Sequence, residues 1–222
     1  MNSSGSSPKP DLQATAVTRR RYQRIAPVYD SMQALGERRY HAWRRRLWAL
    51  AHGPSVLEVG VGTGKNMPFY PAGVSITGID LTPGMLERAR RRMPELGLDD
   101  RVTLQLGDVQ RLDFPDASFD TAVATFVFCS VPDPVLGLRE MKRVIKPGGR
   151  AILLEHMRSP NPAVGALMDL LNPLVVSMMG ANINRHTVEN VQKAGLELER
   201  VEDLGLGGIF KLIVARAPGV GR

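Results

Sequence analysis

The most constraining feature of this 222-residue chain is a glycine-rich segment that directly follows a short apolar run. Residues 56–59 are typical of a buried strand, and Gly60, Gly62 and Gly64 follow at alternate positions. Such glycines let the backbone turn tightly and pass close beneath a ligand, and a helix that begins there offers free N–H groups. The segment therefore predicts a strand–turn–helix unit that binds a ligand at the carboxyl end of a strand.

The spacing of these glycines argues against a dinucleotide site. The dinucleotide fingerprint places its second and third glycines three positions apart, whereas both intervals here are two. Glu58 also lies two residues before Gly60, where its carboxylate would repel a pyrophosphate and suits a ligand with a cationic amino group. A nicotinamide dehydrogenase is therefore disfavoured.

Two further acids stand where neighbouring strands are expected to end. Asp80 follows Gly64 by sixteen residues and is placed to accept both hydroxyls of a ribose. Asp108 can accept from an adenine amino group, while the N–H of Val109 donates to the ring. The three strand ends would thus meet an amino-acid moiety, a ribose and an adenine in this order. A ligand with these three parts is S-adenosylmethionine (SAM).

The rest of the chain predicts an α/β fold, because continuous apolar strands that alternate with helices indicate parallel βα units. The parallel strands are expected at residues 55–60, 74–80, 101–106, 119–127 and 150–155. Helices are expected to start at Thr82-Pro83 and Asp133-Pro134, each an N-cap followed by proline. Pro147-Gly148-Gly149 should end the second of these helices. Residues 196–201 and 209–215 are expected to form an antiparallel pair.

These motifs, together with Lys146-Pro147-Gly148-Gly149, resemble the class I SAM-dependent methyltransferases over roughly residues 15–217. The resemblance implies a Rossmann-like, doubly wound seven-stranded sheet of order 3-2-1-4-5-7-6, with strand 7 antiparallel and an N-terminal helical lid. It implies SAM as cofactor, S-adenosylhomocysteine as product, and contact of Thr125 with the methionine part. The cofactor-binding residues that we expect are Tyr22, Tyr29, Glu58, Gly60, Gly62, Thr63, Gly64, Asn66, Asp80, Leu81, Met85, Asp108, Val109, Thr125, Phe126 and Ser130.

The segment before the glycine motif narrows the choice of acceptor. Residues 24–30, which contain Ala26-Pro27-Val28-Tyr29-Asp30, resemble the entry of ubiquinone/menaquinone C-methyltransferases and of bacterial phosphatidylethanolamine N-methyltransferases. Residues 126–131 and Glu155-His156 also resemble a membrane-associated thiol methyltransferase-like group. The quinone enzymes usually carry Arg-Asn-Val where this chain has Cys129-Ser130-Val131, so N-methylation of phosphatidylethanolamine is the first hypothesis. Quinone C-methylation, a soluble or thiol acceptor, and a non-catalytic SAM-binding role stay open.

Charge is concentrated at the N-terminal end. Residues 1–53 hold ten Lys/Arg and three Asp/Glu, whereas residues 54–222 hold nineteen of each sign. We expect a disordered tail over residues 1–12, a basic helical lid over 13–53 and the SAM-binding domain over 54–222. The basic lid predicts contact with an anionic membrane surface, while nucleic acid is disfavoured because no aromatic-interleaved RNA-binding module appears.

Other classes are excluded by composition. Cys129 is the single cysteine, so neither a disulfide framework nor a cysteine metal cluster is expected, and no metal site is predicted. No apolar run reaches the ~18 residues of a membrane span, and the N-terminus lacks the apolar region of a secretory signal. We expect a cytoplasmic monomer that meets the membrane only peripherally.

Two helices are expected in the lid, at residues 14–24 and 37–51. The second has an apolar stripe of Tyr40, Trp43, Leu47 and Leu50, widened by Trp48, with five arginines (Arg38, Arg39, Arg44, Arg45 and Arg46) on the remaining surface. The stripe either covers the core or lies in a membrane interface with its aromatic rings at headgroup depth.

Acceptor-side candidates are Tyr22, Tyr29, His156 and Arg185. The tyrosines can face the sulfonium by cation–π attraction or simply pack within the lid, and Tyr22 is also assigned to the acceptor. Tyr29 and His156 are the candidate catalytic residues and bases, and His156 is also expected to touch the acceptor. Arg185 would hold a phosphate or form a salt bridge.

Residues 166–179 contain ten apolar residues of fourteen. They predict either a buried helix pair broken at Pro173 or the wall of a pocket for an apolar acceptor.

Overall fold

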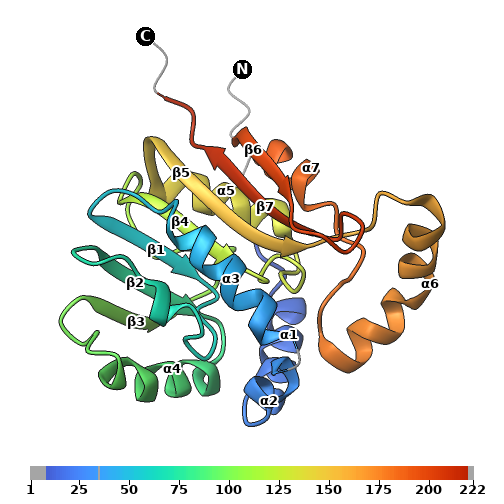
Figure 1. Ribbon diagram of the computed structural model, residues 1–222, viewed down its shortest axis with the longest axis horizontal. Helices are drawn as coiled ribbons and strands as arrows, with labels where there is room; N and C mark the ends of the chain where they lie inside the picture. The colour runs from blue at the N-terminus through green and yellow to red at the C-terminus, as the bar shows by residue number, and fades with distance from the viewer. Residues whose placement is uncertain (1–8, 35, 220–222) are drawn as a thin grey trace.

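The computed structural model, described for residues 9–34 and 36–219, is built on one seven-stranded sheet of order β3-β2-β1-β4-β5-β7-β6 (Figure 1). Strands β3, β2, β1, β4 and β5 are parallel, and β7 runs antiparallel to both β5 and β6. The predicted strand order and the reversed strand 7 are confirmed. The strands are β1 (Ser55–Val59), β2 (Ser75–Asp80), β3 (Val102–Leu106), β4 (Phe119–Thr125), β5 (Ile145–His156), β6 (Glu197–Asp203) and β7 (Phe210–Arg216).

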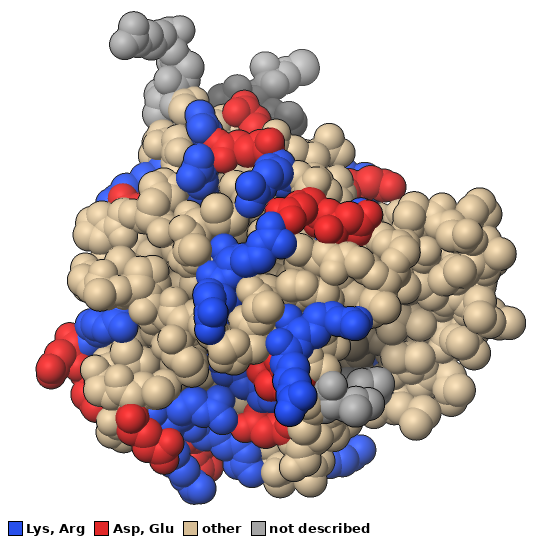
Figure 2. All heavy atoms as spheres, in the orientation of Figure 1, with Lys and Arg blue, Asp and Glu red and all other residues tan. Residues whose placement is uncertain are grey.

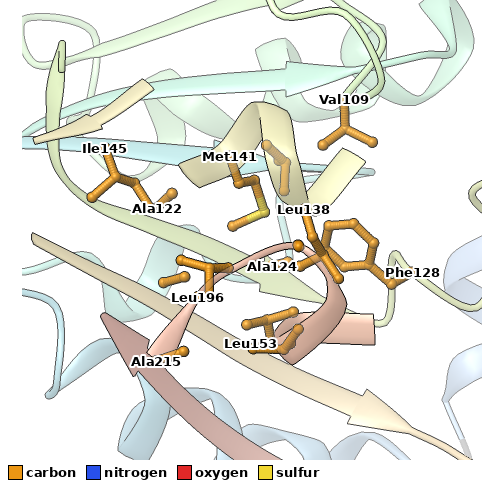
Figure 3. Packing of buried hydrophobic residues seen from close by; sticks show 14 of the residues in the cluster. Val109, Ala122, Ala124, Phe128, Leu138, Met141, Ile145, Leu153, Leu196 and Ala215 are labelled. Atoms are coloured by element: carbon orange, nitrogen blue, oxygen red, sulfur yellow. The ribbon is translucent and has the colours of Figure 1, made fainter. Parts of the chain in front are cut away.

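Helices cover both faces of this sheet, with α3 in front and α5 behind in the view of Figure 1. Because side chains alternate along a strand, Val56 of β1 packs with Trp48 and Leu86 on one face, while Leu57 packs with Leu138 on the other. Figure 3 shows the second layer, where α5 lies over the central strands. The helices are α1 (Leu12–Ile25), α2 (Tyr29–Gln33), α3 (Glu37–Trp48), α4 (Pro83–Glu95), α5 (Pro134–Val144), α6 (Pro162–Met179) and α7 (Thr187–Lys193), with a short 3-10 turn η1 (Met67–Phe69).

Helices α4 and α5 begin at the N-cap residues that the sequence indicated, but only one of these residues makes a capping hydrogen bond with its side chain. Asp133 caps α5 through Leu136 N, as expected. Thr82 occupies the N-cap of α4, but its side chain makes no capping bond. Asp11 caps α1 by accepting from Gln13 N and Ala14 N. The end of the expected tail thus belongs to a helix, and residues 1–8 lie outside the described residues.

The predicted end of the second helix was wrong by a few residues. Helix α5 ends at Val144 and β5 begins at Ile145, so Pro147-Gly148-Gly149 lies within the strand. The register of β5 against β4 is irregular there. A Cβ on Gly149 would lie 2.5 Å from the carbonyl oxygen of Asp120, which explains why the close strand approach needs glycine.

Helix α3 packs its aromatic stripe into the core rather than presenting it to solvent. Trp43, Leu47 and Trp48 are buried in the cluster formed on the α3 face of the sheet. The tryptophans are therefore unavailable to a membrane, and the interfacial interpretation of the stripe is wrong. Arg44, predicted to be on the exposed face, is buried as well, for a reason given below. The division between lid and domain at residue 53 stays a prediction.

Helix α6 contains residues 166–179, for which the sequence left two interpretations open. It is one continuous helix through Pro173 and most of its apolar side chains are exposed, so the expected buried pair is wrong. It lies beyond the end of β5, apart from the sheet (Figure 1). Among the described residues, no helix combines the length and the hydropathy of a membrane-spanning segment.

Candidate active site

A cavity that is partly open to solvent lies at the carboxyl ends of β1, β2, β3 and β4. This is the edge at which open α/β sheets bind ligands, because the parallel strands deliver their following loops to one place. Gly60 and Thr125 line one part of the wall, Asp80 lines another, and Asp108 a third. The three strand ends singled out in the sequence are therefore brought together.

Gly60 and Gly62 form the turn beneath this cavity, and both have positive φ, +67° and +57°. A Cβ on Gly60 would lie 2.4 Å from Val127 Cγ2, whereas a Cβ on Gly62 would meet only the Gly60 carbonyl oxygen, at 3.9 Å. Both glycines are required by backbone conformation, but only Gly60 is also required by space.

Asp80 has its carboxylate held by the backbone on either side. Its Oδ2 accepts from Gly62 N at 2.9 Å and its Oδ1 from Thr82 N at 2.8 Å. Burial raises the pKa of Asp80 from its usual 3.8 to about 6, and these two bonds oppose that rise. Because each carboxylate oxygen has two lone pairs, the carboxylate can still accept from a ligand hydroxyl beside these backbone bonds.

Asp108 is held by a residue that the sequence did not single out. Gln110 donates from its backbone N at 2.9 Å and from its side-chain amide at 3.1 Å to the Asp108 carboxylate. The same amide donates to Thr15 Oγ1 of α1 at 3.0 Å. This end of the cavity is thereby connected to the N-terminal helix, and the only available signal for Gln110 was its position two residues after Asp108.

Helices α1 and α2 cover the cavity with Thr18, Tyr22 and Tyr29. The Tyr22 hydroxyl is hydrogen-bonded to Ser130 Oγ, and the Tyr29 hydroxyl accepts from Gln33 at 2.7 Å. The two tyrosine rings lie 6.4 Å apart. Burial raises the pKa of both phenols, so both stay protonated near neutral pH and neither is suited to act as a base.

Asp30 fastens this cover to the glycine loop. Its carboxylate accepts from Thr63 Oγ1 at 2.6 Å and from Arg92 at 3.0 Å, and it lies 3.9 Å from Lys65 Nζ. Lys65 also pairs with Glu37 at 2.5 Å. The residue after Tyr29 thus holds α2 in place over the cavity, a role that the sequence motif alone did not reveal.

Glu58 lies behind the cavity wall rather than in it. Its carboxylate accepts from Asn66 Nδ2 at 2.6 Å and from the Tyr70 hydroxyl. Asn66 also donates to Thr125 Oγ1 at 3.0 Å and accepts from Arg44 at 2.8 Å. Burial raises the pKa of Glu58 to about 7. The expected direct contact of Glu58 with a cationic ligand is therefore replaced by support of the wall through Asn66.

This network explains why Arg44 is buried. Its guanidinium bonds to Asn66, lies 3.8 Å from Glu37, and has its central carbon 5.8 Å from the centre of the Phe126 ring. Phe126 has φ +57°, unusual for a non-glycine residue, and lines the cavity. Contacts with residues distant in the sequence thus offset the cost of burying the Arg44 guanidinium, and no local sequence pattern reveals these contacts.

Twelve of the sixteen expected cofactor residues line the cavity. They are Tyr22, Tyr29, Gly60, Gly62, Asp80, Leu81, Met85, Asp108, Val109, Thr125, Phe126 and Ser130. The other four, Glu58, Thr63, Gly64 and Asn66, lie outside the lining. The lining residues that the sequence missed are Thr18, Ile79, Thr82, Gly107, Gln110, Val127, Val131 and Pro132.

His156 and Arg185, assigned to the acceptor, also lie outside the lining. The His156 ring packs between Phe126 and Phe210, with centroids 6.3 Å from each. Burial lowers its pKa. Arg185 donates to the carbonyl oxygen of Val131 at 2.8 Å, which favours a structural role over the expected phosphate contact. Among the described residues, no three His, Cys, Asp or Glu side chains group as a metal site would require.

The sequence matches the family model of a methyltransferase domain over residues 57–153. A phosphatidylethanolamine N-methyltransferase of Cereibacter sphaeroides is 46% identical over 106 residues, which cover 48% of this chain and 52% of that relative. The match thus spans about half of that protein. A demethylmenaquinone methyltransferase of Deinococcus radiodurans is 38% identical over 169 residues, covering 72% of this chain and 68% of the relative.

This chain belongs to the class I SAM-dependent methyltransferases. Solved structures agree on the fold. The cyclase SpnF has a TM-score of 0.76 at 20% identity, covering 98% of this chain and 100% of its own. A geranyl diphosphate methyltransferase in complex with GPP and sinefungin has a TM-score of 0.67 at 19% identity, covering 80% and 78%. Because one of these neighbours is a cyclase, the activity is assigned from the sequence relatives and not from the fold.

SAM is the cofactor of this methyltransferase, and the cavity fits it. The carboxylate of Asp80 matches the ribose hydroxyls, and Asp108 with the N–H of Val109 matches an adenine edge. Ile79, Leu81 and Met85 add apolar side chains to the same lining. The individual contacts of these residues with SAM stay predictions.

Proposed function

We propose that this methyltransferase acts on a lipophilic, membrane-resident acceptor, and that the acceptor is the amine of phosphatidylethanolamine and of its methylated intermediates. The observation that carries the proposal is the cluster of Tyr22, Tyr29 and Ser130 on the cavity wall beside Thr125. SAM supplies a methyl group already activated on a sulfonium. The protein's own work is to align an acceptor with that methyl and to exclude water.

The tyrosine–serine cluster suits an amine better than a carbon nucleophile. Protonated phenols and a serine hydroxyl offer oxygens that accept from amine N–H groups, and their ring faces attract a nearby cation. C-methylation of a quinol would need a base to take the hydroxyl proton, and the candidate base His156 does not line the cavity. An amine nitrogen needs only to arrive unprotonated, which burial in an apolar site favours.

Quinone C-methylation is the second candidate function. It is favoured by the demethylmenaquinone methyltransferase of Deinococcus radiodurans, which is matched over 68% of its length. The phosphatidylethanolamine N-methyltransferase match is higher in identity but spans 52% of that relative. Val127, Val131 and Pro132 give the cavity an apolar side that either acceptor would use.

The N-terminal arginines support the membrane part of the proposal. Arg19, Arg20 and Arg24 of α1 are exposed, and no described carboxylate pairs with them. With Gln23 and Pro83 they line a shallow groove on the surface. Each basic residue near an anionic bilayer contributes ~1 kcal/mol of attraction. Arg44 no longer belongs to this surface, because it is buried.

The direct test incubates the enzyme with radiolabelled SAM and with vesicles that contain either phosphatidylethanolamine or demethylmenaquinone. The other lipids of the two kinds of vesicle are the same. We expect label in the phospholipid fraction, and label confined to the quinone fraction or to an aqueous acceptor would overturn the choice of acceptor. Tyr29→Phe should retain most turnover because the ring remains, whereas Tyr29→Leu should lower kcat at least about tenfold. Equal turnover in both variants would remove the ring from the argument.

A further inference from the structure

Helix α6 exposes an almost uninterrupted apolar face. Its exposed large side chains are Val164, Leu167, Leu170, Leu171, Leu174 and Met178. Leu170 is 76% exposed and Met178 is 72% exposed. The recurring spacing of three and four residues places most of these side chains on one side of the helix.

Two polar residues of α6, Asp169 and Asn172, bond to neighbouring segments of the protein, whereas the large apolar side chains are exposed, which is unlike an ordinary surface helix. Asp169 is the single charged residue between Pro162 and Met179, and it pairs with Arg158 at 2.9 Å. Asn172 accepts from Ile183 N at 2.9 Å and donates to Asn182 at 3.2 Å. These contacts hold the helix by its polar side, so the leucines point away from the body of the enzyme.

Positive charge lies beside this apolar surface. In Figure 2 the uncharged lobe that contains α6 occupies the right side; Lys and Arg side chains lie next to its lower half, and an acidic group adjoins its upper border. The end of α6 also reaches α1, since a Cβ on Gly180 would lie 3.4 Å from Arg21 Cδ and 3.6 Å from the Tyr22 ring. Arg19 and Arg20 lie on the same helix as Arg21 and are exposed.

We propose that α6 lies in the interface of an anionic lipid bilayer, with its leucine face among the acyl chains and the α1 arginines on the headgroups. The helix does not qualify as a membrane span, so it would lie parallel to the surface. This inference rests on the proposed lipophilic acceptor and names the element that brings the enzyme to it. Tyr22 and Ser130 of the cavity wall would then lie close to the bilayer.

A bilayer fits this face better than a second copy of the chain. A second copy would cover the leucines, but the leucine face of that copy offers no account of the exposed α1 arginines beside the patch. A bilayer instead offers acyl chains to the leucines and phosphates to the arginines, so both parts of the surface find a partner.

The test compares Leu167→Ser/Leu170→Ser/Leu174→Ser with a matched control, Leu96→Ser/Leu106→Ser/Leu206→Ser. The control residues are also exposed, from 40% to 54%, but lie elsewhere on the surface. The probe is a vesicle of phosphatidylglycerol and phosphatidylcholine, which contains no amine acceptor. We expect the α6 variant to bind these vesicles at least about tenfold more weakly than wild type, while the control binds normally. Both variants should bind S-adenosylhomocysteine as wild type does, which shows that the fold is retained.

Each outcome decides the inference. The inference is overturned if the wild type and the α6 variant bind the vesicles equally. It is also overturned if the wild-type enzyme does not bind the vesicles. A wild-type dimer in sedimentation that becomes a monomer in the α6 variant, without vesicle binding, assigns the face to a second copy instead. Vesicle binding that depends on α6, with label only in a soluble acceptor, leaves the inference standing and overturns the proposed function alone.

Discussion

The affinity of this enzyme for its cofactor should depend on pH through Asp80. Asp80 accepts from Gly62 N and Thr82 N and lines the cavity, where its carboxylate can accept from a ribose hydroxyl. Only the ionised carboxylate can accept from both hydroxyls. Its pKa is raised to about 6. The carboxyl of Asp80 must therefore lose its proton when the cofactor binds, and the free-energy cost of that ionisation rises as the pH falls.

The size of the effect follows from that pKa. At pH 5, one unit below it, about one tenth of the enzyme carries ionised Asp80, and ionising the rest costs about 1.4 kcal/mol. Above pH 7 nearly all of it is ionised. We expect the affinity for S-adenosylhomocysteine to rise about tenfold from pH 5 to pH 7 and then to level off.

Isothermal titration calorimetry with S-adenosylhomocysteine measures this without turnover. Asp80→Asn should bind more weakly at pH 7 and show little change over the same range, because the titrating group is gone. Asp108→Asn serves as the control, since it should weaken binding but keep the slope. A wild-type profile without slope, or the same slope in Asp80→Asn, would refute the assignment of Asp80 to the ribose.

Three further predictions concern the turn, the core and a buried acid. Gly60→Ala should weaken S-adenosylhomocysteine binding more than Gly62→Ala in the same titration, because only the first Cβ clashes, with Val127; equal losses would contradict this. Leu47→Ala should lower the free energy of unfolding in urea by about 2–5 kcal/mol, since Leu47 is fully buried; a loss below about 1 kcal/mol would show that α3 is a detachable cover. Burial raises the pKa of Glu155 to about 7 from 4.5, so the folded state holds more protons than the unfolded state between these values and stability falls as pH rises through that window. Glu155→Gln should reduce this loss of unfolding free energy between pH 5 and pH 7 by up to about 3 kcal/mol. If urea denaturation at the two pH values shows the same loss in the variant as in the wild type, other groups cause the pH dependence.

Much of the cavity was predictable because its chemistry lies at strand ends. The glycines, Asp80 and Asp108 each follow a buried strand directly, and parallel strands bring such positions to one edge. Gln110 and Thr18 were not predictable in the same way, because neither carries a local pattern that marks a ligand. They reach the cavity only through the loop after β3 and the placement of α1 over it.

Residues whose roles depend on distant partners were misjudged. Arg44 was predicted to be a surface arginine of a basic helix, yet it is buried against Asn66 and Phe126. Glu58 was expected to face the ligand, yet Asn66 and Tyr70 take its carboxylate. A hydrogen bond across many residues offsets the loss of hydration on burial, and such a partner leaves no trace in local spacing.

The sequence by itself determined the fold class, the order of the ligand-binding strand ends and the methyltransferase family, because strand periodicity, turn glycines and motif spacing are local properties. Tertiary structure alone decided what the apolar faces of α3 and α6 meet. It placed the aromatic stripe of α3 in the core and the leucines of α6 in solvent. An apolar stripe shows that a helix must cover an apolar surface, but only the position of the neighbouring elements shows whether that surface belongs to the same chain.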